Sequence, residues 1–371
     1  LYRVDFDLPD PAGRKLELEF EAVDYRCVVW LNGRELGRHQ GASDAFRFDA
    51  TTAVRPGANR LHVLVHAAEP EPGQIGRTSE VRTWKPRFAY GWDWNCRLIP
   101  LGIWGGVRAV LHDGIVLEDL WWRTDLSADL SSVEILALAT VRADRPRRAR
   151  LRAGLEEPGV GEVAASESET LLVSGPNVLS LPMSLSTPKL WYPRGYGEQP
   201  LYDLRLQVEA GDGATIDGAC RLGVRDVRWT RTEGAPPEAL PYTPIVNGTR
   251  VYLRGFNWVP PDNLYGGASA KHRPSVKLAA ECNANMLRVW GGAPIATRDF
   301  YEACDEHGIL VWQEFTQSSS GIDNEPPTDP EYLAMATREA AGIVRKLRVH
   351  PSLVIWCGGN ELMDDNWKPL G

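Results

Sequence analysis

The sequence is poor in cysteine, and its six cysteines are not paired along the chain. They are Cys27, Cys96, Cys220, Cys282, Cys304 and Cys357. Because none of them stands in a Cys-x-x-Cys pair, the sequence predicts neither a zinc site nor a redox-active dithiol. Several lie inside apolar stretches, as buried reduced thiols do, and this favours a cytoplasmic location.

A long apolar run is also missing, since no stretch approaches the ~20 residues that a membrane-spanning helix needs. No signal peptide is visible. The chain begins with Leu1 rather than methionine, and Val4, Phe6 and Leu8 already alternate like residues of a strand. We therefore expect the native start to lie before Leu1, where a signal peptide would stand, and we predict no membrane partner.

The chain has no excess of positive charge. Lysine and arginine number 41 against 49 aspartates and glutamates, which gives a net charge of −8 at pH 7. A negative balance argues against nucleic acid and against an anionic membrane surface as partners. The basic run at residues 145–148 is short and typical of a solvated surface.

Tryptophan, by contrast, is abundant, with 14 in 371 residues. Many of these tryptophans lie in predicted loops or at strand ends. A flat indole ring there suits a ligand with apolar CH faces and polar edges, such as a sugar. Packing in the core and between domains is the alternative for more than half of them. Length and composition, with 43% hydrophobic residues, indicate a globular chain of two or three domains.

Residues 1–113 read as an all-β domain. Val28–Leu31 runs into Asn32-Gly33, a strong two-residue hairpin signal, and the chain returns through Arg34–Leu36. Another turn precedes the β-branched run Leu61–Val65. Short strands at this spacing without a helical period predict a jelly-roll sandwich.

Residues 114–228 form a second β segment, for which the spacing of strands and turns predicts an immunoglobulin-like sandwich without its disulfide. The strands are expected at Val133–Val141, Arg148–Leu155, Leu201–Val208 and Cys220–Val224. Residues 229–241 are rich in Thr, Glu and Pro and read as a linker.

Residues 242–371 change to an alternation of strands and helices. We expect strands at Val251–Arg254, Asn285–Trp290, Ile309–Trp312 and Leu353–Trp356, and helices at Ser275–Cys282, Thr297–His307 and Pro330–Arg348. Four such repeats predict strands 1–4 of a (β/α)₈ TIM barrel, which needs ~250 residues when complete. An open parallel sheet is the competing topology.

The last predicted strand, which reads as fully buried, leads to the most informative motif, Trp356-Cys357-Gly358-Gly359-Asn360-Glu361. Active sites of such barrels lie at the carboxyl ends of the strands. A carboxyl group flanked by an amide at that place suits acid/base chemistry on a sugar. Glycoside hydrolysis normally needs two carboxylates, and we expect the second to lie outside this chain.

Five motifs, in this order, resemble glycoside hydrolase family 2, and particularly its β-mannosidase branch. They are residues 29–37, residues 190–202, residues 246–260, Arg288-Val289-Trp290-Gly291-Gly292, and residues 356–361. A sixth, Tyr90-Gly91-Trp92-Asp93-Trp94, resembles the loop that reaches from the first domain into the sugar pocket. Asn95-Cys96 before Arg97, where Gly-Pro is more usual, and Gly359, where a second Asn is common, depart from that branch.

The resemblance implies a retaining exo-β-glycosidase that acts on a β-linked oligosaccharide or glycoside, with no cofactor and no metal. Glu361 would be the general acid/base and Asn360 would bind the sugar 2-hydroxyl. We expect an apolar, tryptophan-lined pocket around Glu361. Because the nucleophile would come from a later barrel strand, we expect the 371-residue chain alone to be inactive. The sequence does not predict the oligomeric state.

Further residues are candidates for substrate binding, each with a structural alternative. They are Trp92, Asp93, Asn257, Arg288, Trp290, Glu314 and Trp367. Arg288 would orient the nucleophile or form an ordinary ion pair, and Trp290 would stack on the sugar or pack in the core. Asp93 would clamp hydroxyls or be a surface acid.

Two other classes of function stay open. One is a different specificity in the same fold, such as β-galactosidase, β-glucuronidase or exo-β-glucosaminidase. The other is a non-catalytic carbohydrate-binding protein, which applies if the reading frame ends at Gly371.

Overall fold

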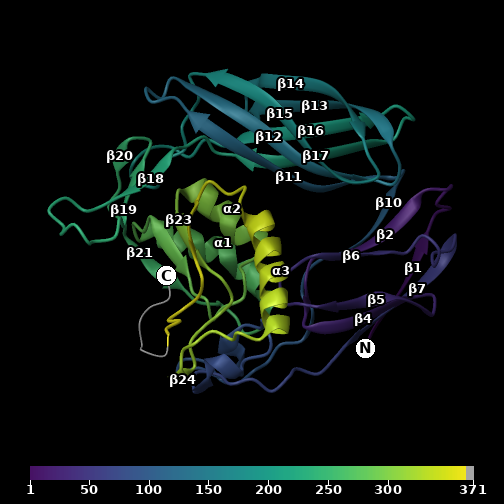
Figure 1. The fold of residues 1–371 in the computed structure, drawn as a ribbon, viewed down its shortest axis with the longest axis horizontal. Helices are drawn as coiled ribbons and strands as arrows, with labels where there is room; N and C mark the ends of the chain where they lie inside the picture. The colour runs from purple at the N-terminus through teal and green to yellow at the C-terminus, as the bar shows by residue number, and fades with distance from the viewer. Residues whose placement is uncertain (365–371) are drawn as a thin grey trace.

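The structure is a computed structural model, and it describes residues 1–364. Figure 1 shows three parts: a β-sandwich at the lower right, a second sandwich across the top, and a β/α part at the lower left. The segment of the first part that carries the short 3₁₀ helices η1 (Thr78–Glu80) and η2 (Arg87–Tyr90) lies beneath the β/α part. No helix among residues 1–364 is both long and apolar enough to cross a membrane.

The first part packs two antiparallel sheets face to face. One has the order β1-β7-β4-β5 and the other β10-β2-β6. The predicted hairpin is confirmed, because Asn32 and Gly33 both adopt positive φ angles between paired strands. The strands are β1 (Tyr2–Leu8), β2 (Lys15–Phe20), β3 (Val23–Asp24), β4 (Arg26–Leu31), β5 (Arg34–Gln40), β6 (Phe46–Asp49), β7 (Gly57–Val65), β8 (Gly76–Arg77), β9 (Gly102–Ile103) and β10 (Val107–His112).

The second part is a sandwich of the sheets β11-β12-β15 and β14-β13-β16-β17. Inward residues alternate with exposed ones, as in β16, where Leu204, Leu206 and Val208 are buried. Burying each such side chain contributes about 1.5–3 kcal/mol. The strands are β11 (Ile115–Leu126), β12 (Ser132–Ala143), β13 (Arg147–Glu157), β14 (Gly161–Leu172), β15 (Gly175–Ser186), β16 (Tyr202–Ala210) and β17 (Thr215–Leu222). All six cysteines are free thiols.

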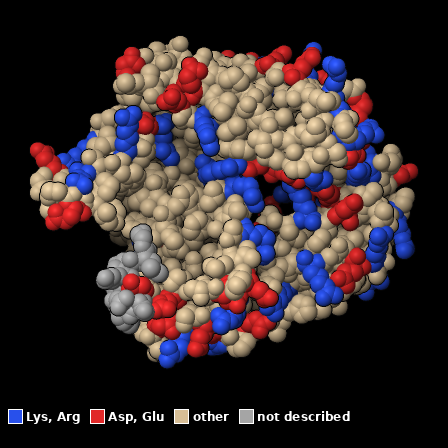
Figure 2. Space-filling model, viewed as in Figure 1, with Lys and Arg blue, Asp and Glu red and all other residues tan. Residues whose placement is uncertain are grey.

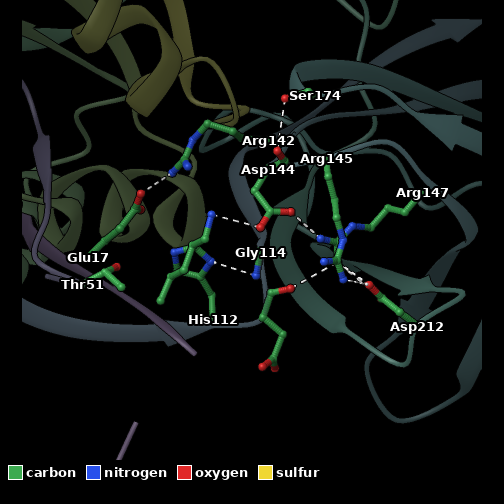
Figure 3. Close-up of polar contacts among 12 residues, drawn as sticks. Glu17, Thr51, His112, Gly114, Arg142, Asp144, Arg145, Arg147, Ser174 and Asp212 are labelled. Carbon is green, nitrogen blue, oxygen red and sulfur yellow. Dashed lines mark hydrogen bonds and ion pairs between the residues drawn. The ribbon is translucent and has the colours of Figure 1, made fainter. Parts of the chain in front are cut away.

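Charged side chains join the two sandwiches (Figure 3). Arg142 pairs with Glu17 at 2.6 Å, and Lys15 pairs with Asp144 at 3.0 Å. The buried Arg147 also reaches Asp144. A cavity of about 360 Å³ lies between the sandwiches. Because its charged side chains are largely paired with one another, we assign it no ligand.

A small antiparallel sheet of β18 (Val227–Thr230), β19 (Thr243–Val246) and β20 (Thr249–Arg250) precedes the β/α part. This differs from the expected linker at 229–241, because residues 229 and 230 belong to β18. Pairing of Trp229 with Pro244 and of Thr230 with Thr243 holds them in the sheet. The connecting segment is therefore a loop between two paired strands.

The β/α part has a parallel sheet in the order β21-β22-β23-β25. Its elements are β21 (Gly255–Trp258), α1 (Tyr265–Glu281), β22 (Met286–Val289), α2 (Arg298–His307), β23 (Leu310–Glu314), β24 (Gly321–Asp323), α3 (Pro330–Leu347) and β25 (Leu353–Cys357). Four strands in chain order with intervening helices confirm the predicted barrel segment.

The first strand lies later than predicted, at Gly255–Trp258 instead of Val251–Arg254. Side chains satisfy the backbone before it: Tyr196 Oη accepts from the Tyr252 amide at 2.7 Å, and Asn285 Oδ1 accepts from the Arg254 amide at 2.8 Å. Gly255 lies so close to the neighbouring strand that an added Cβ would fall 1.8 Å from the Met286 carbonyl oxygen. Because these side chains bond the backbone before Gly255, the strand-to-strand hydrogen bonds of β21 begin only at Gly255.

The first helix was predicted too short. It begins at Tyr265, ten residues before the expected start, and contains Pro274. Tyr265, Ala268 and His272 are buried. Their packing outweighs the cost of a proline inside the helix.

The last strand is less buried than predicted. Leu353 is 7% exposed, but Val354 and Ile355 are half-buried and Trp356 is 37% exposed. β25 pairs with β23 on one side only among residues 1–364. Its other edge therefore has no neighbouring strand in the part that the structure describes.

The first sandwich and the β/α part share a buried core. Tyr25 and Trp84 of the first part pack with Tyr332 and Met335 of α3. Strand β8 pairs in parallel with β24, although about 240 residues of sequence lie between them.

On the face in Figure 2, charges of both signs are mixed over the surface.

Candidate active site

Arg288 of β22 is the centre of a hydrogen-bond network at the carboxyl ends of the strands. Its Nε donates to Glu314 Oε1 at 2.8 Å, and its Nη1 donates to Asn257 Oδ1 at 3.1 Å. Its Nη2 donates to Asn360 Oδ1 at 2.8 Å. The planar fork of a guanidinium allows these bonds together. One side chain thus connects β21, β22, β23 and the segment after β25.

Glu314, the last residue of β23, is a fixed carboxylate. It is 2% exposed, and it accepts from Arg288 and, through Oε2, from the Gly291 amide at 2.8 Å. A buried carboxylate needs such partners. These bonds favour a role for Glu314 in holding the strand ends together, and its predicted contact with a sugar hydroxyl stays a prediction.

Both the side chain and the backbone of Asn360 are fixed by hydrogen bonds. Its amide oxygen accepts from Arg288, and its Nδ2 donates to Ser318 Oγ at 3.1 Å. Its backbone amide donates to the Gln317 carbonyl at 2.9 Å, and its carbonyl accepts from the Ser319 amide at 3.0 Å. Asn360 is only 5% exposed. The segment after β25 is therefore fixed against the segment after β23.

Glu361 follows in the left-handed region with φ 52°. Ser319 Oγ donates to its Oε2 at 2.9 Å. Its side chain is exposed, so the apolar, tryptophan-lined surroundings that we expected are not provided by residues 1–364.

Three tryptophans meet beside this network. The rings of Trp92 and Trp290 lie 4.9 Å apart between centroids, and those of Trp94 and Trp290 lie 5.7 Å apart, all edge to face. Trp290 is 7% exposed, whereas Trp94 is 47% exposed. The surface that remains open for stacking therefore belongs mainly to Trp92 and Trp94. Asp93 between them is exposed.

The loop that carries these tryptophans is anchored to the β/α part. The Phe88 amide donates to the Gly292 carbonyl at 3.1 Å, and Phe88 packs in one cluster with Trp290. The structure thus brings Trp92 from the first sandwich beside β22. Trp367 lies outside the described residues. No group of three or more potential metal-binding side chains occurs among residues 1–364.

Ser318 and Ser319, whose hydroxyls contact Asn360 and Glu361, are not among the site residues predicted from the sequence. Trp94 belongs to the motif that resembles the pocket loop, but it was not a predicted site residue either. The available signal was the run of three serines that begins four residues after the end of the buried strand β23, because polar side chains are seldom buried without a bonding partner. All three serines are nevertheless buried.

Two β-sandwiches followed by parallel β/α strands, with a carboxylate and an amide at the strand ends, define a multidomain glycosyl hydrolase architecture. Three family models match the chain: "Glycosyl hydrolase 2 galactose-binding domain-like" at residues 1–105, "Glycosyl hydrolases family 2" at 115–225, and its "TIM barrel domain" at 243–368. Together they cover most of the chain, which therefore belongs to glycosyl hydrolase family 2.

The sequences and structures of known proteins are also similar to this chain. Beta-mannosidase B of Thermothelomyces thermophilus is 34% identical over 97% of this chain and 43% of its own length. The solved β-D-mannosidase of Dictyoglomus thermophilum matches with a TM-score of 0.83 and 28% identity, over 97% of this chain and 45% of its own. A Bacteroides uniformis β-glucuronidase matches with a TM-score of 0.77 over 97% of this chain and 40% of its own. At 20% identity, that last match shows the fold alone.

The chain thus spans less than half the length of these relatives.

Proposed function

We propose that the protein is a retaining exo-β-glycosidase that removes terminal β-mannosyl residues, with Glu361 as the general acid/base. The observation that carries the proposal is the pair Asn360 and Glu361, fixed at the carboxyl end of β25 with the glutamate open to solvent. The relatives named beta-mannosidases support the choice of sugar.

In the first step, Glu361 protonates the oxygen of the leaving group while a second carboxylate attacks the anomeric carbon. In the second step, Glu361 accepts a proton from water, and the water oxygen bonds to the anomeric carbon. The bond from that carbon to the second carboxylate breaks, and its electron pair returns to the carboxylate. In this proposal Asn360, which directly precedes Glu361, bonds the 2-hydroxyl, a contact that strengthens in an oxocarbenium-like transition state. Trp92 and Trp94 offer ring surface to the sugar.

The second carboxylate must lie about 5–5.5 Å from Glu361 in a retaining enzyme. Glu314 is unsuited, because Arg288 and the Gly291 amide already occupy its oxygens in a buried position. We propose that the nucleophile is a glutamate outside residues 1–371. Turnover by residues 1–371 in isolation would contradict this assignment.

Hydrolysis of 4-nitrophenyl β-glycosides by the protein at its native length tests the function. We expect the β-mannoside to be cleaved at least tenfold faster than the β-galactoside, β-glucuronide or β-glucosaminide. A preference for one of the other sugars would keep the family and replace the specificity. Sugar binding without turnover would favour a non-catalytic protein.

Glu361→Gln tests the acid/base role. Loss of a general acid should lower kcat/KM about 10²–10⁴-fold on a substrate with a poor leaving group. Glu281→Gln, an exposed glutamate at the end of α1, is the matched control and should leave the rate unchanged. Equal rates for Glu361→Gln and the unsubstituted protein would reject Glu361.

A further inference from the structure

Three consecutive serines, Ser318, Ser319 and Ser320, connect the first sandwich to the predicted catalytic pair. They lie between β23 and β24, and they are 2%, 5% and 0% exposed. Each hydroxyl has a different partner: Ser318 Oγ accepts from Asn360 Nδ2 at 3.1 Å, Ser319 Oγ donates to Glu361 Oε2 at 2.9 Å, and Ser320 Oγ accepts from Arg87 Nη2 at 2.8 Å.

The backbone of this serine run is fixed from two sides. The Ser319 amide donates to the Asn360 carbonyl at 3.0 Å, which ties the run to the segment after β25. The Gly76 amide donates to the Ser320 carbonyl at 2.7 Å, which ties it to β8 of the first sandwich. A hydroxyl on a backbone held at both ends has little freedom to leave its partner.

Asp323, which follows the serine run, is also hydrogen-bonded to the first part of the chain. The Asp323 carboxylate accepts from the Ser79 amide at 2.9 Å and from Ser79 Oγ at 3.0 Å. Arg87 is 3% exposed, so its bond to Ser320 is shielded from water. The first sandwich therefore contributes to the position of the serine run through buried contacts.

The Ser319 hydroxyl donates a hydrogen bond to one carboxyl oxygen of Glu361, Oε2, and makes no bond to the other, Oε1. Among residues 1–364, no hydrogen-bond donor to Glu361 Oε1 is found, so Oε1 is the oxygen free to exchange a proton. A hydroxyl that donates to Oε2 restricts the rotation of the carboxyl group. This restriction acts on proton transfer and not on the binding of the sugar.

We propose that Ser319 is a positioning residue that orients Glu361 for proton transfer through Oε1, an inference that rests on the acid/base role proposed above. In glycosylation, the bond from the anomeric carbon to the leaving oxygen breaks, and its electron pair stays on that oxygen. The oxygen takes the proton from Oε1, while the second carboxylate bonds to the anomeric carbon. Ser319 keeps its own proton throughout.

Dependence on the leaving group separates this role from a structural one. A 2,4-dinitrophenyl group leaves without being protonated, whereas an alkyl group needs the acid. Ser319→Ala should therefore lower kcat/KM for a methyl β-mannoside by about tenfold to a hundredfold. It should change kcat/KM for the 2,4-dinitrophenyl β-mannoside by less than about twofold. Ser319→Thr retains the hydroxyl and should restore most of the loss.

Ser318→Ala is the matched control, since it removes one hydroxyl from the neighbouring, equally buried residue. Its partner Asn360 contacts the sugar in the proposed mechanism, so both substrates should lose rate by the same factor. If Ser319→Ala does not fold, Ser319→Cys, a weaker donor of similar size, should show the same selectivity with a smaller loss.

The outcomes distinguish the inference from the function on which it rests. A selective loss on the methyl glycoside supports the positioning role. No loss, or equal losses on both substrates, overturns it while the glycosidase function stands. Absence of turnover by the unsubstituted protein on either substrate overturns the proposed function and the inference together.

Discussion

Arg288 is the side chain on which the polar centre depends most, because it bonds to Asn257, Glu314 and Asn360. A lysine has one compact ammonium group and cannot make these bonds together. It would also leave the buried Glu314 with an incomplete set of donors.

Arg288→Lys should therefore lower glycosidase kcat about tenfold to a hundredfold and the free energy of unfolding by about 1–3 kcal/mol. Urea unfolding and steady-state kinetics would measure both. Arg298→Lys is the control, since Arg298 is 76% exposed and pairs with Glu302 within one helix. It should shift stability by less than about 0.5 kcal/mol. Identical behaviour of the two variants would refute the central role of Arg288.

Residue identities at the site were predictable, whereas their contacts were not. The sequence showed Asn257, Arg288, Glu314 and Asn360 near predicted strand ends, because polar residues after apolar runs are visible as a pattern. Which of them bond to each other depends on the neighbours and register of the strands. The left-handed backbone of Glu361 likewise has no signal in the local sequence pattern.

At the scale of elements, Gly291 lets the loop after β22 approach the segment after β23. A Cβ on Gly291 would lie 2.5 Å from the Gln317 carbonyl oxygen, 2.8 Å from that of Phe315 and 3.0 Å from the Asn360 amide nitrogen. All three are backbone atoms, so a methyl group must push whole segments apart.

Gly291→Ala should lower the free energy of unfolding by about 1–3 kcal/mol and also reduce activity, because it displaces Asn360. Gly266→Ala is the control: it lies in α1 with no atom within 4 Å of an added Cβ. That substitution should be neutral or stabilise by about 0.5–1 kcal/mol. Thermal unfolding of the two variants and of the unsubstituted protein would measure this difference. A Gly291→Ala variant as stable as the unsubstituted protein would show that the loops are not packed as described.

Helix ends illustrate how far sequence rules reach. The predicted helix after Thr297 is confirmed as Arg298–His307, and Gly308 ends it with φ 68°. Thr297 stands at the N-cap but makes no capping bond with its side chain, and its Oγ1 lies 2.7 Å from His272 Nδ1 instead. The prediction of helix α3 is correct within one residue, because apolar residues recur at helical spacing. In the structure, the Asp329 side chain caps this helix. In α1, packing against the rest of the protein outweighs the local signals, so the helix start predicted from the sequence is wrong.

At the scale of the whole molecule, a buried carboxyl joins the first sandwich to α3. Glu339 is 0% exposed and accepts from the Ala42 amide at 2.7 Å and the Ser43 amide at 3.2 Å. Burial, reinforced by the nearby Asp44 charge, raises the pKa of Glu339 to about 8. Burial acts to raise the pKa of Asp44 too, but His39 and Arg338 outweigh it and hold that pKa below its usual value.

A raised pKa means that the folded state binds the Glu339 proton more tightly than the unfolded chain, whose value is near 4.5. This stabilisation is complete below pH 4.5 and is lost as the pH rises towards 8. Between pH 5 and 8.5 the free energy of unfolding should therefore fall, by on the order of a few kcal/mol.

Glu339→Gln keeps a carbonyl acceptor without the charge, so its stability should be flatter across this range and higher than that of the unsubstituted protein at pH 8.5. Urea unfolding at several pH values checks this. Glu331→Gln, at an exposed position in the first turn of the same helix, should retain the original pH dependence. A parallel pH dependence in Glu339→Gln would exclude Glu339 as its source.

The amino-acid sequence alone predicts the order of the three parts, the hairpin at Asn32-Gly33 and the motif that ends in Asn360-Glu361, because these depend on local periodicity and turn chemistry. Three contacts exist only in the folded chain: Trp92 of the first sandwich meets Trp290, Ser319 bonds to Glu361, and Glu339 is buried against Ala42. Each of these contacts joins segments that are tens to hundreds of residues apart. Local patterns carry no record of such contacts, since packing between finished elements creates them.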